Sequence, residues 1–118
     1  MSPAAPLLSS FRCAIFLVPM LAAAAAGAAD GGPSPTRAAE LVNLVRQDCG
    51  SCHGLRFKGG LGPALLPEAL AGRDRESLKR VILDGRPGTP MPPWRGLITE
   101  PEAGWIVDQL AAGFPDER

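Results

Sequence analysis

This chain contains few or no residues of several types, and each scarcity limits the classes of protein to which it can belong. Its 118 residues include no tyrosine, one histidine, three cysteines and three methionines. Twelve basic residues balance twelve acidic ones, so the charge carries no strong signal for binding to nucleic acid or to a membrane surface. Glycine and proline supply 27 residues, close to the level of disordered chains, yet 46% of all residues are apolar. We therefore expect one small domain, provided that something completes its core.

The first 29 residues have the features of a secretory signal peptide. Arg12 precedes a short apolar run, an alanine tract follows, and small residues at 26–29 offer a cleavage site before Asp30. An uncleaved membrane anchor is the alternative, although the run is short and rich in alanine at its end. We interpret Cys13 as part of the signal peptide. Cleavage would place the protein in the periplasm and leave two cysteines, one histidine and one methionine.

The stretch 49–53, Cys-Gly-Ser-Cys-His, has the spacing of an attachment site for c-type haem. Cys49 and Cys52 would each add across one vinyl group of the porphyrin, and His53 would coordinate the iron as the proximal ligand. One alternative is a dithiol redox centre, which should lie beside a βαβ pattern, and another is half of a zinc site. The sequence has no such pattern and no further Cys or His after signal removal. We therefore predict one haem c, bound covalently through both thiols.

Met91 is the one methionine that remains after signal removal, and it lies in a proline-rich loop. Residues 86–94 contain four prolines, which exclude a helix interior and a central strand and stiffen the loop. A methionine is more often core filler, but a thioether opposite His53 would raise the reduction potential and close the iron to substrates. Lys58 in this place, or an open iron, is the alternative. We predict His53 and Met91 as the axial ligands.

Further residues are candidates for contacts with the haem or its ligands. The carbonyl of Pro63, in a stiff turn, can accept a hydrogen bond from the second ring nitrogen of His53 and fix its tautomer. Trp94 needs a partner for its indole N–H, which a haem propionate would supply, although plain core packing is the alternative. Four cations are candidates for balancing the propionates and equally for solvated surface charge, namely Arg56, Lys58, Arg86 and Arg95.

The first helix carries the haem motif. Ser34 followed by Pro35 is typical of an N-cap and a first helical position. Residues 30–35 are then a flexible leader, and the domain spans 36–115. Apolar residues at helical spacing continue this helix to about residue 48 and deliver both thiols to one face.

The rest of the domain alternates loops with helices. The stretch 54–72 has no helical or strand period, apart from one helical turn near 67–70, so we expect it to surround the haem edge. Asp74 is the predicted N-cap of a middle helix that Gly85 ends. A capping box that begins at Thr99 starts the last helix. The chain is therefore predicted to be all-α, without credible strand pairs and with its first and last helices crossing.

From about Leu41 to Phe114 the chain resembles the class I cytochromes c. Within them it is similar to the small NirC-type cytochrome c of denitrifying bacteria, which is associated with cytochrome cd1 nitrite reductase. The resemblance rests on Cys-Gly-Ser-Cys-His-Gly at 49–54, Lys-Gly-Gly-Leu-Gly-Pro-Ala-Leu at 58–65, Val-Ile-Leu-Asp-Gly-Arg-Pro-Gly-Thr-Pro-Met-Pro-Pro-Trp at 81–94 and Trp-Ile-Val at 105–107. The haem motif is common to cytochromes c, whereas the run that contains Met91 is much narrower.

This resemblance implies a class I cytochrome c fold, with three to four helices around one haem c. It also implies a periplasmic, monomeric electron carrier with axial His53 and Met91, in which Pro63 supports His53. The implied partner is cytochrome cd1 nitrite reductase as electron acceptor, and no enzymatic activity is expected. Two alternatives stay open. One is an accessory role in the maturation of haem d1 and nitrite reductase, and the other is an open-iron sensor or enzyme.

Overall fold

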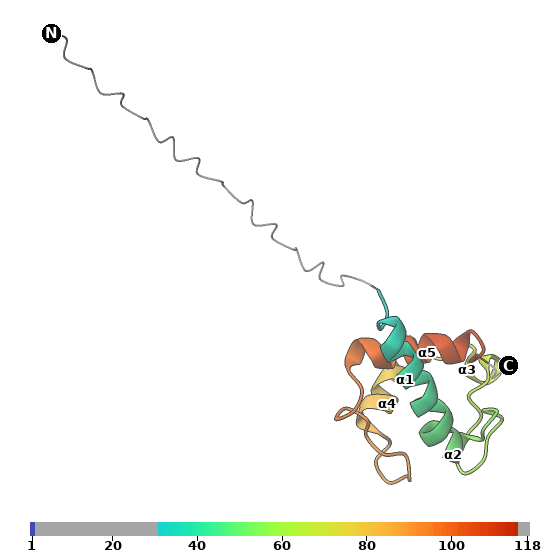
Figure 1. Ribbon diagram of the computed structural model, residues 1–118. Coiled ribbons are helices and arrows are strands. Elements are labelled where there is room, and N and C mark those ends of the chain that lie inside the picture. The colour runs from blue at the N-terminus through green and yellow to red at the C-terminus, as the bar shows by residue number, and fades with distance from the viewer. Residues whose placement is uncertain (2–30, 116–118) are drawn as a thin grey trace.

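The structure is a computed structural model that describes Met1 and residues 31–115 (Figure 1). The rest of the predicted signal peptide lies outside the described residues. Within residues 31–115 the regular structure is entirely helical, and no strand occurs there. The prediction of an all-α fold is therefore confirmed.

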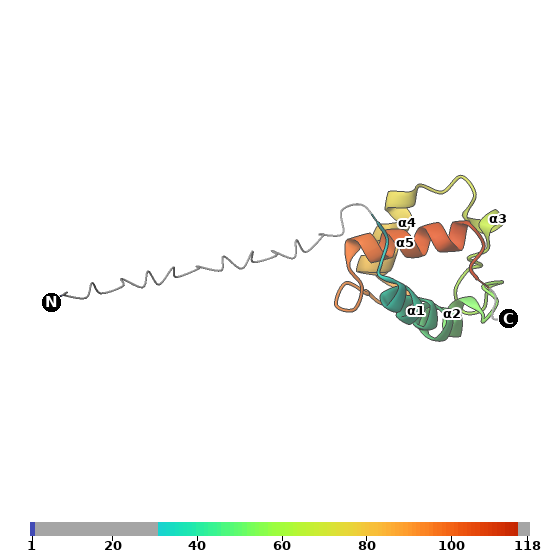
Figure 2. The ribbon, with the colours of Figure 1, turned by 45° about the horizontal axis from the view of Figure 1, so that its top comes forward.

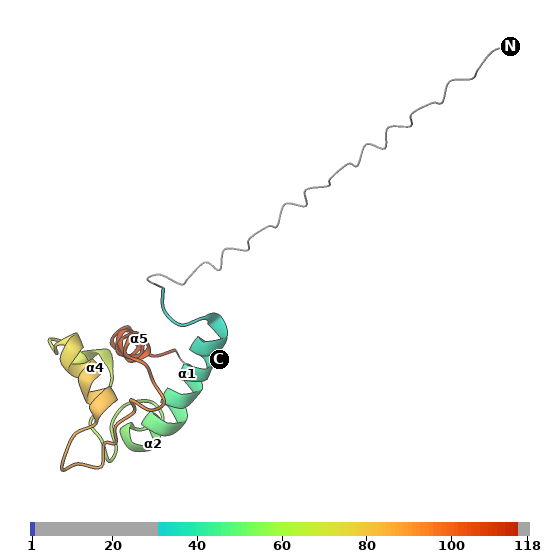
Figure 3. The same ribbon diagram turned by 90° about the vertical axis from the view of Figure 1, so that its left-hand side faces the viewer.

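The helical segments surround the last helix of the chain. They are α1 (Pro35–Leu44), the π-helical segment η1 (Val45–Cys49), α2 (Gly50–His53), α3 (Pro67–Leu70), α4 (Arg75–Asp84) and α5 (Glu100–Ala111). Figure 2 shows α5 crossing above α1, and Figure 3 shows α4 and the α1–α2 path on either side of α5. Helix α5 also packs directly against α4 and α3. The first and last helices therefore cross as predicted.

Capping residues explain where the longer helices begin. Each predicted N-cap accepts a hydrogen bond from the backbone N–H three residues on: Ser34 from Arg37 at 3.3 Å, Asp74 from Ser77 at 2.7 Å and Thr99 from Glu102 at 3.4 Å. The Glu102 carboxylate in turn accepts from the Thr99 N–H at 2.8 Å, which completes the capping box. Gly85, with φ of 68°, ends α4. The predicted caps are therefore confirmed.

One helical path leads into the haem motif, but it is not α-helical throughout. Between Val45 and Cys49 the path widens to a π-helix, and the N–H of Gly50 donates to the Val45 carbonyl five residues back. The path then returns to α-helix and ends at His53. Helical backbone therefore extends beyond the predicted end near residue 48, so the whole attachment motif lies on the helix.

The loop after α2 is held by the end of that helix. The N–H of Gly59 donates to the His53 carbonyl at 2.9 Å, and the N–H of Gly62 donates to the Cys52 carbonyl at 2.8 Å. These bonds satisfy carbonyls that a helix end leaves without a partner. A Cβ placed on Gly54, whose φ is 85°, would lie 2.8 Å from the Gly59 carbonyl oxygen. The close return of the loop therefore needs glycine at 54.

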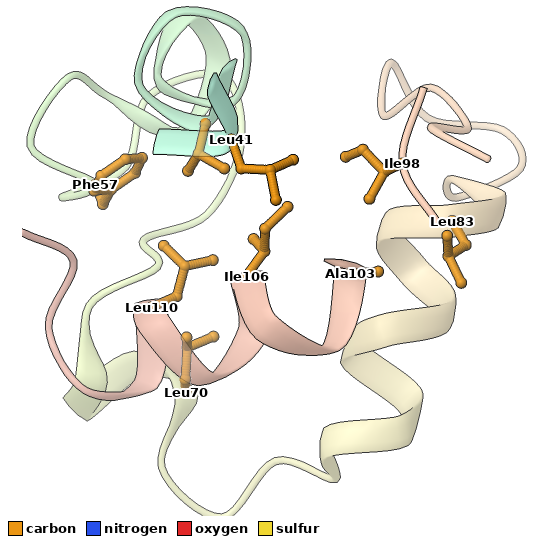
Figure 4. Close-up of a cluster of buried hydrophobic side chains, with 9 residues drawn as sticks. Leu41, Phe57, Leu70, Leu83, Ile98, Ala103, Ile106 and Leu110 are labelled. Atoms are coloured by element: carbon orange, nitrogen blue, oxygen red, sulfur yellow. The ribbon is translucent and has the colours of Figure 1, made fainter. Parts of the chain in front are cut away.

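The buried core lies where the α1–η1 path meets α5 (Figure 4). Leu41 and Val45 are fully buried, and Ile106 of α5 is 1% exposed. Burying one such side chain contributes about 1.5–3 kcal/mol. An ion pair between Arg37 and Glu102, at 2.5 Å, joins α1 to α5 beside this core. The remaining buried members of the cluster are Phe57, Leu70, Leu83, Ile98, Ala103 and Leu110.

Candidate haem site

His53 is the last residue of α2, and its side chain is buried. Its ring nitrogen Nδ1 lies 2.7 Å from the carbonyl oxygen of Pro63. A carbonyl can only accept, so Nδ1 is the donor in this hydrogen bond, and in the neutral ring Nε2 then has a free lone pair. The hydrogen bond therefore orients the imidazole and prepares Nε2 to bind a metal.

Gly62 lies directly against the ring of His53. A Cβ placed on Gly62 would lie 2.7 Å from both Cε1 and Nδ1 of that ring. Its φ is not in the left-handed region, so close contact and not backbone conformation explains the glycine here. The backbone at Gly62 therefore packs against the imidazole ring and limits its movement.

Cys49 and Cys52 border the same cavity as His53 and form no disulfide with each other. Burial, and to a lesser extent the Asp48 carboxylate, raises the pKa of the Cys49 thiol to about 11. Thiols of redox centres instead have lowered pKa values, because the thiolate is their reactive form. Among the described residues no group of three or more His, Cys, Asp or Glu side chains could hold a metal ion. The shift of the Cys49 pKa is therefore opposite to that of a redox thiol.

A cavity of about 780 Å³ lies next to these three side chains. Its volume is in the range of roughly 300–1,000 Å³ that is typical of sites for small molecules and cofactors. Helices α2, α3, α4 and α5 all contribute to its walls. The walls are mostly apolar and include Leu70, Leu78, Val81, Ile82, Ile106, Val107 and Leu110. A flat apolar group would therefore be sheltered from water here.

Met91 also lines this cavity, on a loop anchored to the C-terminal end of α4. The N–H groups of Trp94 and Arg95 both donate to the Leu83 carbonyl at 3.1 Å. Gly85 lies against the same loop, since a Cβ placed there would lie 2.7 Å from the Met91 carbonyl oxygen. The proline-rich loop therefore starts and ends on α4, and it brings the one described methionine beyond Met1 to the cavity.

The other predicted contact residues divide between the cavity and the surface. Trp94 and Arg86 line the cavity. Arg95 instead forms ion pairs with Asp84 at 2.8 Å and with Glu100 at 3.1 Å. These partners favour the surface-charge interpretation of Arg95 over a contact with a propionate.

Two of the four candidate cations lie away from this cavity, and one further cation that the sequence does not mark lines it. Arg56 and Lys58 line a second hollow, so the geometry does not support Lys58 as the alternative axial ligand. Arg73, just before α4, lines the haem cavity. It follows a glycine and carries no periodic or motif signal, so sequence reasoning had no means of finding it.

These residues fit a covalently tethered haem. Two thiols and an oriented imidazole sit on one helical turn, beside an apolar cavity that a thioether also borders. Such a site within an all-α domain defines the class of protein, a c-type cytochrome.

Comparison with known proteins agrees with this class. The chain belongs to the family described as cytochrome C oxidase, cbb3-type, subunit III, which matches residues 36–109. It is similar to a solved c-type cytochrome NirC, with 61% identity and a TM-score of 0.68 over 70% of this chain and 96% of that one. It is 62% identical to cytochrome c55X of Pseudomonas aeruginosa over 87 residues, which are 74% of this chain and 73% of the relative.

A third similarity is to part of a much larger protein. The solved dihydro-heme d1 dehydrogenase NirN in complex with DHE is 39% identical, with a TM-score of 0.56. The match covers 64% of this chain but 16% of that one. The similarity is therefore confined to one part of that protein and does not extend to the rest of it.

The fold and the cofactor follow from these findings. The chain has the class I cytochrome c fold, and its resemblance to NirC-type cytochromes is confirmed. Its cofactor is haem c, bound covalently at the Cys49 and Cys52 spacing. In the described part of the chain no helix is both long and apolar enough to cross a membrane. The boundaries of the signal peptide, leader and domain stay predictions.

Proposed function

We propose that this chain is a periplasmic monohaem electron carrier in which His53 and Met91 are the axial iron ligands. The observation that carries the proposal is that an imidazole held by Pro63 and a thioether on an anchored loop border one cavity. Bound haem c supplies one-electron chemistry between ferrous and ferric iron. His/Met ligation would leave no open position on the metal, so the proposed role is electron transfer and not catalysis.

The residues around the cavity have separate tasks in this proposal. Pro63 and Gly62 hold the His53 ring, and the bonds to α4 hold the loop of Met91. Holding both ligands in place keeps the coordination the same in the two oxidation states, which lowers the cost of reorganisation. Apolar walls exclude water, and Trp94, which lines the cavity, would supply an indole N–H to a propionate.

An optical spectrum of the purified, exported protein tests the ligands. We expect a sulfur-to-iron charge-transfer band in the ferric form, and we expect Met91→Ala to abolish it and lower the reduction potential. Leu61→Ala is the matched control, because Leu61 also borders the cavity but is 75% exposed. Absence of the band from the wild type, together with ready binding of carbon monoxide to the reduced form, would instead support an open-iron sensor or enzyme.

Export and oligomeric state are part of the same proposal. The intact mass of the exported protein should equal that of the chain from about Asp30 onward plus one haem, since cleavage is expected before that residue. Sedimentation should give a monomer. A mass that still includes residues 1–29 would favour the membrane-anchor alternative.

The proposed electron acceptor is a cytochrome cd1 nitrite reductase. The proposal is supported by the similarity to NirC and by exposed apolar residues next to the cavity, Leu61, Pro92 and Pro93, which suit a small and short-lived contact. Reduced protein should be reoxidised rapidly when that enzyme and nitrite are both present, and slowly when either is left out. Equal rates in all three mixtures would contradict this partner.

A second candidate function is an accessory role in the maturation of haem d1 and nitrite reductase. The similarity to a dihydro-heme d1 dehydrogenase is the observation that favours it. A deletion strain separates the two functions. Normal haem d1 content with slow nitrite turnover supports direct donation, whereas depleted haem d1 supports the maturation role.

A further inference from the structure

The loop that carries Met91 has few backbone N–H groups that can form hydrogen bonds. Four of the nine residues from 86 to 94 are prolines and lack an N–H, so five backbone donors remain. Four of these five donate hydrogen bonds within the loop or to the end of α4, namely those of Arg86, Thr89, Met91 and Trp94. The shape of the loop therefore depends on a small number of specific bonds.

The side chain of Thr89 connects the start of this loop to the proposed ligand. Its Oγ1 donates to the Arg86 carbonyl at 2.6 Å and accepts from the N–H of Met91 at 3.3 Å. The N–H of Thr89 donates to the same Arg86 carbonyl at 3.0 Å, and the N–H of Arg86 donates to the Met91 carbonyl at 3.2 Å. The hydroxyl thus closes a ring of bonds that begins and ends at Arg86 and contains the Met91 backbone.

This ring of hydrogen bonds matters because the methionine side chain is flexible. A Met side chain has three rotatable bonds, so the placement of its backbone decides where the sulfur can reach. We propose that the Thr89 hydroxyl is a positioning group that holds Met91 on the iron. The inference rests on the axial role of Met91 proposed above. Thr89 is exposed, so the loss of its hydroxyl loosens the loop without opening the core.

Imidazole binding to the ferric holoprotein measures how readily Met91 leaves the iron. Thr89→Val keeps the branched shape and removes the hydroxyl, whereas Thr89→Ser keeps the hydroxyl. We expect Thr89→Val to bind imidazole about fivefold more tightly, the factor that corresponds to about 1 kcal/mol for the lost hydrogen bond to the Met91 N–H. Thr89→Ser and the control Thr36→Val, an exposed threonine of α1, should stay within about twofold of the wild type.

Thermal unfolding of the same variants distinguishes positioning from general stability. The positioning role is supported if all variants unfold at the wild-type midpoint and Thr89→Val alone binds imidazole more tightly. Unchanged imidazole affinity in Thr89→Val, with the sulfur-to-iron band intact, overturns it and leaves the axial role of Met91 standing. A wild-type protein without that band overturns both proposals.

Hydrogen exchange on the wild-type holoprotein gives a test that needs no variant. The Met91 amide should exchange more slowly than the amide of Gly88 in the same exposed loop, because Thr89 accepts its hydrogen bond. Equal exchange rates for the two amides would show that the hydroxyl does not hold Met91 and would overturn the inference.

Discussion

Replacing Gly62 with alanine tests how far the haem site depends on one close backbone contact. The added methyl carbon would lie 2.7 Å from two atoms of the His53 ring and 3.1 Å from Nε2. Real Cβ atoms do not approach so closely, so either the ring or the loop must move. Because Gly62 immediately precedes Pro63, either movement disturbs the hydrogen bond from Nδ1 of His53 to the Pro63 carbonyl.

The expected cost follows from these two effects. Overpacking a well-filled site costs about 1–3 kcal/mol. The weakened hydrogen bond of His53 adds about 1 kcal/mol. A loss of roughly 2–4 kcal/mol in the free energy of unfolding lowers the midpoint of a domain of this size by roughly 8–32 °C.

Thermal unfolding of the ferric holoprotein, followed by circular dichroism and by the Soret band, measures this cost. Gly96→Ala is the matched control, because nothing lies within 4 Å of a Cβ placed there and its φ is not left-handed. We expect the midpoint of Gly96→Ala to equal that of the wild type, and the reduction potential to change in Gly62→Ala alone. Equal midpoints and potentials in both variants would refute the idea that Gly62 seats the imidazole.

Two further predictions concern the cofactor and the crossing of α1 and α5. The double variant Cys49→Ser/Cys52→Ser cannot tether haem, and a domain this small depends on the haem to complete its core, so far-ultraviolet circular dichroism should show it largely unstructured. Native-like helicity would contradict this. The second concerns pH: the hydrogen bond from Arg37, followed by the backbone bond at the cap, lowers the pKa of Glu102 to about 2. The ionised carboxylate therefore stabilises the fold above its unfolded pKa of about 4.5, and this contribution is lost as the pH falls toward 2. The free energy of unfolding should decrease from about pH 5 to 2 more steeply in the wild type than in Glu102→Gln. The control Glu68→Gln, at an exposed residue, should follow the wild type. Parallel curves for all three proteins would show that the ion pair does not contribute to the pH dependence of stability.

Helix starts were predictable because the interactions that create them are local. Ser34, Asp74 and Thr99 each bond a backbone N–H only three residues away, so the sequence pattern and the structure describe the same contact. The π-helical stretch from Val45 to Cys49 was not predictable, because apolar spacing does not distinguish an α-turn from one wider turn. Apolar spacing therefore predicts an end near residue 48, whereas the helical backbone continues to His53.

The site shows the same division between local and distant interactions. The spacing of Cys49 and Cys52 is a local pattern, and it was sufficient to predict the cofactor. The ion pairs of Arg95 join residues that meet only after the chain folds back, and sequence reasoning left its role open. Arg73 reaches the cavity because α3 and α4 place it there, and no pattern marks it.

Both proposed ligand segments are held in the same physical way, by the carbonyls at the end of a helix. The Cys52 and His53 carbonyls of α2 accept N–H groups from the loop that supplies Pro63, and the Leu83 carbonyl of α4 accepts N–H groups that follow Met91. A helix end leaves such carbonyls without partners unless a cap, water or a loop supplies them.

The position of each proposed ligand is therefore fixed by hydrogen bonds that also complete a helix end. Fraying of α2 or α4 would release the proposed ligand next to it, and strong ligation of the iron would in turn keep that helix end closed. Loss of axial ligation and melting of these two helix ends should then occur as one event. In a chain this rich in glycine and proline, that coupling explains how two loops can fix the two proposed ligands without a large core behind them.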